Sequence, residues 1–206
     1  MKLFIGLLLL LIPTLNYGYK KNELPYPIAI LKADLIVDGT ITKVSKNEYE
    51  FAITQFVKGK SDSKIKVSIW KEWLCDPRIK ELKTGQRLIL LLEKTTHNNF
   101  ATINNSTGEL YIDNNSFINI FLPKDFSTPE IFKKGILMFI ETYKFYGDSN
   151  DKFFQNVYFE CNKSIFEIYL MKQNNSTFNF LVNYTNYFKI KEIHPVFQIK
   201  NLQIFG

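Results

Sequence analysis

The fold of this chain is decided by four stretches: ADLIVDGTITKV (residues 33–44), YEFAITQFVKGK (49–60), KIKVSIWKEWLC (64–75) and TGQRLILLLEK (84–94). Each contains an apolar segment of strand length and is closed by Gly, Asn, Ser or a short charged run. Such spacing is typical of a small barrel in which turns separate short antiparallel strands. We therefore expect a mainly β protein that begins with a five-stranded antiparallel barrel.

Alternation along these stretches shows which residues face the core. Ile65, Val67 and Ile69 point one way in the third stretch, with polar side chains between them. Gly39 interrupts the first stretch, where we expect a bulge that bends the strand. The run 88–92 is apolar without a break, which is typical of a strand covered on both faces. Another element must therefore pack outside the barrel.

The segments 100–103 and 109–112 bracket the sequence NNSTG (104–108). Two short apolar segments around Asn and Gly predict a hairpin. We expect this hairpin to complete a barrel domain that extends over residues 33–122.

The order of these motifs resembles the TIMP-like (tissue inhibitor of metalloproteinases) and netrin-module group of secreted OB-folds. The residues that carry the resemblance are Gly39-Thr40-Ile41, Lys58-Gly59, Cys75 and Gly85 to Leu90, and the match covers residues 33–93. TIMP proteins inhibit through the amino group and carbonyl of an N-terminal Cys, whereas no Cys precedes Cys75 here. The resemblance therefore implies an extracellular OB-like barrel and does not carry over that inhibitory mechanism.

Residues 1–18 have the pattern of a secretory signal peptide. Lys2 provides the positive charge, residues 3–12 form the apolar region, and Gly18 is a small residue suited to cleavage. A membrane-spanning helix needs about 20 apolar residues, and polar residues begin here at Thr14. We expect a secreted, periplasmic or extracellular protein with no membrane insertion after cleavage, and an N-terminal arm at 19–32.

The rest of the chain predicts one helix that packs on the barrel and a C-terminal extension with a core of its own. The spacing of Ser127 and Glu130 predicts the start of a helix over residues 127–147, whose apolar stripe packs on the fourth strand. Residues 151–206 are rich in aromatic side chains and predict a C-terminal antiparallel β extension. Its expected strands are 153–159, 165–171, 177–184 and 196–200.

Cys75 and Cys161 are the two cysteines of the chain. In an exported protein they are candidates for a disulfide, which would stabilise by about 4 to 5 kcal/mol on the loop-entropy model. Two separate buried thiols are the alternative, because sequence fixes no distance between the residues. The sequence leaves both arrangements open.

Trp70 and Trp73 lie in a loop next to the barrel and are our candidate binding residues. Two exposed rings would form a stacking platform, and OB-folds bind ligands on this side of the barrel. The alternative is that at least one ring caps the barrel core. We expect an extracellular or periplasmic protein or glycan as the partner.

Few residues in this sequence suggest catalysis or metal binding. Net charge is +6, and the Lys residues are dispersed among acidic ones, so we expect no nucleic-acid partner. With only His97 and His194 beside the cysteines, we expect no metal, no cofactor and no enzyme activity. Asp34 and Asp38 are interpreted as edge or loop acids. The function predicted is a non-catalytic binding module; the alternatives are a protease inhibitor acting through a barrel loop and, less favoured, a hydrolase or thiol enzyme.

Overall fold

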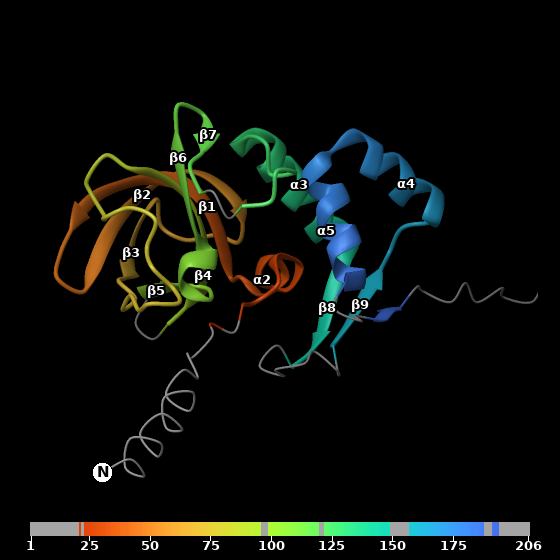
Figure 1. Ribbon diagram of the computed structural model, residues 1–206, viewed down its shortest axis with the longest axis horizontal. Coiled ribbons are helices and arrows are strands. Elements are labelled where there is room, and N and C mark those ends of the chain that lie inside the picture. The colour runs from red at the N-terminus through yellow and green to blue at the C-terminus, as the bar shows by residue number, and fades with distance from the viewer. Residues whose placement is uncertain are drawn as a thin grey trace, which may run out of the picture.

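The computed structural model describes residues 21, 23–95, 99–119, 122–148, 157–187 and 191–193. The barrel lies at one end of the molecule and a group of helices with a small sheet at the other, with a short helix, α2 (Tyr26–Lys32), between them (Figure 1). The predicted signal peptide (1–18), His97, His194 and the predicted strand 196–200 lie outside the described residues.

Five strands close the barrel: β1 (Leu35–Val44), β2 (Glu48–Lys58), β3 (Lys64–Ser68), β4 (Arg87–Lys94) and β5 (Asn99–Thr102). Their order is β1-β2-β3-β5-β4, and β4 pairs back with β1. The β3–β5 pair is parallel, and the other neighbours are antiparallel. The predicted OB-fold-like five-stranded barrel is confirmed.

The structure of residues 99–113 differs from the predicted hairpin. β5 and the next strand, β6 (Glu109–Asp113), both pair with β4, on successive parts of its length. A 3₁₀ turn, η3 (Asn105–Gly108), separates them. The hairpin instead follows β6, where Asn114 and Asn115 adopt positive φ and β7 (Ser116–Phe117) returns. The sequence NNSTG therefore interrupts one strand, because Asn tolerates the left-handed conformation that the turn requires.

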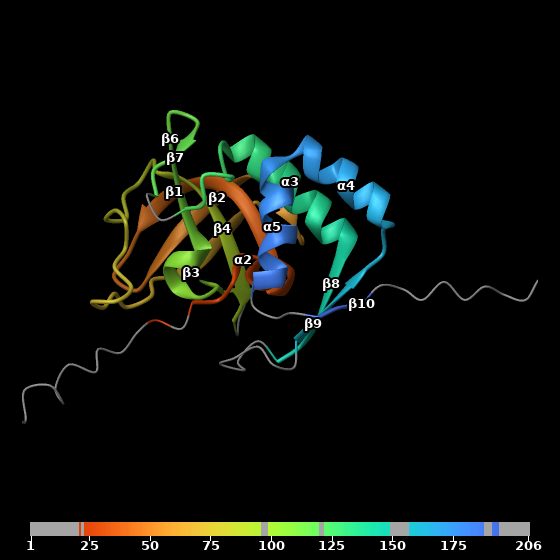
Figure 2. The same cartoon turned by 45° about the vertical axis from the view of Figure 1, so that its right-hand side comes forward.

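Strand β4 separates two hydrophobic cores. Leu88, Leu90 and Leu92 point into the barrel, whereas Ile89 and Leu91 point out toward the helices. The outer core is completed by Ile28 and Ile30 of α2 and by Phe132, Ile136 and Phe139 of α3 (Pro129–Thr142). This confirms that a helix covers the outside of the barrel. Figure 2 shows α3, α4 and α5 grouped beside the barrel, with α2 at its wall.

Gly39 occupies a bulge of the β1–β2 pair, as predicted. The register shifts between Asp38 and Gly39. A Cβ at Gly39 would lie 2.2 Å from the carbonyl oxygen of Ala52 and 2.7 Å from the Phe51 ring. The two strands approach this closely only because residue 39 has no side chain.

Helix α3 is shorter than predicted at both ends. Its N-cap is Thr128, whose side chain accepts a hydrogen bond from the Ile131 amide, and not Ser127. The helix ends at Thr142, and residues predicted as its last turn form β8 (Tyr143–Gly147). β8 pairs with β9 (Val157–Cys161), so sheet pairing decides the conformation of these residues.

The C-terminal extension contains an antiparallel hairpin, β8–β9, but two of its predicted strands are helices. Residues 165–171 belong to α4 (Ile165–Asn174) and residues 177–184 to α5 (Ser176–Tyr187). Ser164 and Glu167 form a capping box, and the Asn175 side chain accepts a hydrogen bond from the Phe178 amide. A short strand, β10 (Lys191–Ile193), adds to β9 in parallel. Among the described residues, no helix has the length and apolar character to span a membrane.

Candidate binding site

The segment between β3 and β4 crosses one end of the barrel and is fixed there by buried charge. Arg78 donates hydrogen bonds to Glu109 at 3.0 Å and to Glu72 at 2.9 Å, and its guanidinium lies 4.2 Å from the centre of the Trp70 ring. Both charged side chains of the Arg78–Glu109 pair are almost fully buried. Burial raises the pKa of the Glu109 carboxyl, and hydrogen bonds from Arg78 and Tyr111 offset only part of that rise.

Within this segment, residues 73–76 form a tight turn with an apolar tip. The Asp76 amide donates to the Trp73 carbonyl oxygen at 3.0 Å, which closes the turn. Leu74 is 95% exposed and Trp73 is 37% exposed. Cys75 is also exposed. The turn therefore holds a leucine almost entirely in solvent.

The base of this turn is anchored by a buried carboxylate. Asp76 is 2% exposed, and Lys21 donates to it at 3.0 Å. The Ser106 hydroxyl also donates to Asp76. Lys21 binds the hydroxyls of Ser106 and Thr107 of η3 at 2.8 and 3.2 Å. The 73–76 turn is thus tied at once to the N-terminal arm and to the barrel.

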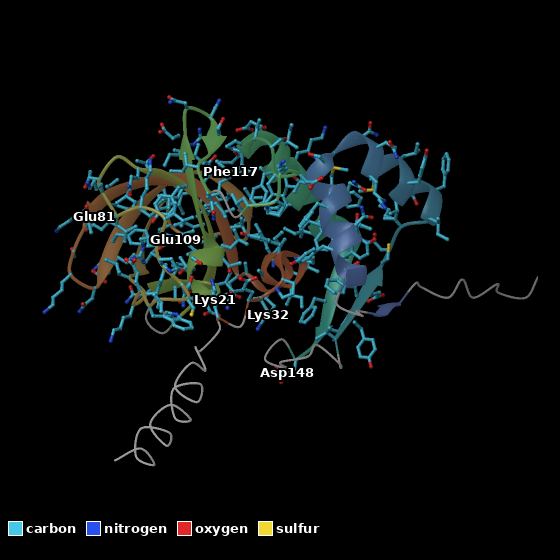
Figure 3. All side chains as sticks on the ribbon, in the orientation of Figure 1. Lys21, Lys32, Glu81, Glu109, Phe117 and Asp148 are labelled. Atoms are coloured by element: carbon cyan, nitrogen blue, oxygen red, sulfur yellow. The ribbon has the colours of Figure 1, made fainter. Side chains whose placement is uncertain are left out.

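The N-terminal arm is held along the same side of the barrel. The Leu24 amide donates to the Asn104 side chain at 3.1 Å, beside η3. Figure 3 labels Lys21 and Glu109 on this side. The arm, η3 and the loop before β4 therefore meet at one end of the barrel, and the 73–76 turn stands on that junction.

The structure places the predicted binding residues in this loop but in different surroundings. The Arg78 guanidinium covers one face of Trp70, whereas Trp73 is half-exposed in the turn. Leu74, Asp76, Arg78 and Lys21 were not predicted. Leu74 gave no signal, because a single apolar residue in a loop belongs to no alternating or helical pattern that would show whether it is exposed. The pairing of Lys21 with Asp76 spans distant parts of the sequence.

The candidate disulfide between Cys75 and Cys161 is absent, and both thiols are free. Cys75 lies in the exposed turn. Cys161 is fully buried in the outer core beside Phe159, and its thiol lies 3.5 Å from the carbonyl oxygen of Lys163. The thiols are separate, as in the alternative, but only Cys161 is buried; the expectation that both would be buried is wrong for Cys75.

The interpretation of Asp38 as an edge or loop acid is wrong. Its side chain is 1% exposed and receives hydrogen bonds from Arg87 at 3.0 and 2.8 Å and from Lys133 at 2.8 Å. Lys133 lies on α3 and also donates to Gln55 of β2 at 2.7 Å. This buried ion network joins the barrel to the helices. Asp34, by contrast, is exposed, and its carboxylate accepts a hydrogen bond from the Lys94 amide.

A groove lies on another part of the barrel, away from the 73–76 turn. This groove of about 510 Å³ runs between residues 80–87 and the β6–β7 hairpin, and Lys80, Lys83 and Arg87 contribute its positive charge. Arg87 is already bound to Asp38 and to the Asn115 side chain. Within the described ranges, no three His, Cys, Asp or Glu side chains are arranged to hold a metal ion.

Comparison with protein families and with curated proteins finds no match to this chain.

Proposed function

We propose that this chain is an exported, non-catalytic binding module that presents the 73–76 turn of its OB-fold-like barrel to a protein partner. The observation that carries the proposal is the 95% exposure of Leu74 on a turn whose base, Asp76, is buried and multiply hydrogen-bonded. Burying one leucine side chain contributes about 1.5 to 3 kcal/mol. Because the turn is already ordered, little of that gain is lost in ordering it on binding.

A protein surface suits this tip better than a sugar. Sugars stack on open aromatic faces, and one face of Trp70 is taken by Arg78. The most exposed side chain in the turn is the aliphatic Leu74, with Trp73 beside it. Aromatic or aliphatic anchors fill pockets at the centre of protein interfaces, and Trp is among the residues enriched there.

Two features of the sequence support export. Residues 1–18 have the signal-peptide pattern. The resemblance of residues 33–93 to the TIMP-like and netrin-module group supports the same placement outside the cytoplasm.

The proposal is tested by affinity capture with the purified chain that begins at Tyr19. Extracellular or periplasmic extract of the producing cells is passed over the immobilised wild type, Leu74→Ser, Trp73→Ala and the control Leu137→Ser. Leu137 is an exposed leucine on α3, far along the chain from the turn. We expect the captured protein to be lost with Leu74→Ser and Trp73→Ala and kept with Leu137→Ser. Equal capture by all four proteins, or capture of glycan alone, rejects the proposal.

Inhibition of a secreted protease by the same turn is the second candidate function. A convex turn with an exposed apolar residue and a fixed base is the geometry that enters a protease cleft. The wild type and Leu74→Ser are incubated with a panel of secreted zinc and serine proteases. Slower cleavage with the wild type alone supports this function, and unchanged cleavage rates with both remove it.

A further inference from the structure

Helix α4 has an uncovered apolar face. Ile165, Phe166, Tyr169 and Leu170 are 80%, 69%, 57% and 44% exposed, and no residue of the helix is buried. On the other side of the helix, Ile168 and Met171 pack partly against the outer core. The four exposed residues are spaced so that they form one continuous stripe. We call these four residues the α4 face.

An exposed stripe of this kind is unusual on a soluble surface. Single exposed leucines are ordinary, but four large adjacent apolar side chains indicate a surface that something covers. The helix does not need the stripe in order to form, because Ser164 and Glu167 cap its start. The α4 face is therefore available for a contact of its own.

The last described strand, β10, runs in the same direction as the strand that leads to α4. β10 pairs with β9 in parallel, with Lys191 opposite Tyr158 and Ile193 opposite Glu160. The chain after Glu160 continues to Ile165, the first residue of α4. Since paired parallel strands run the same way, β10 runs in the direction that leads from β9 to α4.

Residues 194–206, HPVFQIKNLQIFG, have the length and composition to cover the face. They include six large apolar side chains and one charged one, Lys200. Thirteen residues reach about 43 Å when extended, whereas a ten-residue helix such as α4 is about 15 Å long. The segment is therefore long enough to pass the residues before α4 and to lie along the helix.

We propose that residues 194–206 dock on the α4 face of the same molecule. Their apolar side chains bury the α4 face, so that the C-terminal segment lies across the helical end of the protein. The contact is held by apolar burial and depends on neither the barrel nor the 73–76 turn.

A cysteine pair tests this docking in the full chain. The background is Cys75→Ser, which leaves only the buried Cys161, and the test pair is Phe166→Cys with Leu202→Cys. The control pair joins Leu202→Cys to Asp62→Cys, which replaces an exposed residue in the β2–β3 turn of the barrel. Mild oxidation at low protein concentration should give an internal disulfide, seen as a faster-migrating monomer, for the test pair and none for the control pair.

Three outcomes overturn the proposal: no internal disulfide, equal crosslinking by both pairs, or a disulfide-linked dimer, which would mean that a second copy covers the face. An independent measurement compares binding of the apolar dye ANS to the full chain and to a chain that ends at Ile193. We expect higher dye fluorescence without residues 194–206, and loss of that increase when Phe166→Ser is added. Equal dye binding by the two chains contradicts the docking even if the disulfide forms.

Discussion

Lys133→Met is expected to be one of the most destabilising single changes on α3. The side chains of Lys133 and Asp38 are 5% and 1% exposed, and the Lys133 ammonium nitrogen lies 2.8 Å from a carboxylate oxygen of Asp38. Removing one partner of a buried ion pair costs about 3 to 5 kcal/mol, because the remaining charge stays buried without its partner. Asp38 retains two hydrogen bonds from Arg87, so we expect the lower end, about 3 kcal/mol.

The double variant Asp38→Leu/Lys133→Met tests whether the loss of stability comes from leaving one buried charge without its partner. Replacing both buried charges by apolar groups is often nearly neutral, and Arg87 is exposed enough to turn toward water. We therefore expect the double variant to be more stable than either single variant, with a non-additive coupling energy of several kcal/mol.

Urea unfolding followed by circular dichroism measures these free energies. The midpoint shifts at constant slope if the variants change stability alone. A loss under about 1 kcal/mol for Lys133→Met, or a double variant whose loss equals the sum of the single losses, would refute the reasoning. Either result would mean that the network does not hold α3 to the barrel.

Three further changes probe the rest of the fold. Burial alone would raise the pKa of Asp38, but hydrogen bonds from Arg87 and Lys133 hold it below its ordinary value. Its stabilising contribution is therefore full above about pH 3.9 and is lost as the pH falls through the folded-state pKa, so Asp38→Asn should flatten the acid side of a plot of urea midpoint against pH. Gly39→Ala should cost about 3 kcal/mol or more by thermal or urea unfolding, because its Cβ would meet the backbone of Ala52; a cost near zero would show that β1 and β2 separate easily. Thr128→Ala should cost about 1 kcal/mol through loss of the α3 cap, while Ser127→Ala, its matched neighbour, should cost almost nothing; equal costs would contradict the assignment of the cap.

The barrel was predictable because its strands carry their own signal. Burial is indicated by the alternation in β3 and by the apolar run of β4, and strand bending is indicated by Gly39. Each of these signals lies within a few residues of sequence. The outer helix followed from the same run, since a strand that is apolar on both faces needs a second cover.

The C-terminal part was predicted less well because its composition suits two conformations. α4 and α5 contain many aromatic and other residues that favour strands. Both segments are nevertheless helices, and the side chains of Ser164 and Asn175 accept hydrogen bonds from backbone amides at their N-termini. Tyr143 and its successors left the helical pattern because β9 offered a pairing partner. Neither local preference nor periodicity reports such long-range pairing.

The candidate site was only partly predictable for a similar reason. The tryptophans pointed to the loop that carries the exposed 73–76 turn, but the position of this turn depends on where Asp76 is anchored. Lys21 reaches Asp76 across more than fifty residues of sequence. Asp38 was expected at an edge or in a loop but is buried. Its burial depends on ion pairs with Arg87 and Lys133, and no sequence pattern indicates these pairs.

The most direct test of the proposed function is photo-crosslinking from the tip of the turn. Benzophenone-alanine is placed at position 74 or, as the control, at position 137, and each protein is irradiated in extracellular or periplasmic extract of the producing cells. We expect a discrete covalent protein adduct from position 74 and none from position 137. Adducts of the same size and yield from both positions, or none from position 74 while the wild type still captures a partner, would contradict the account.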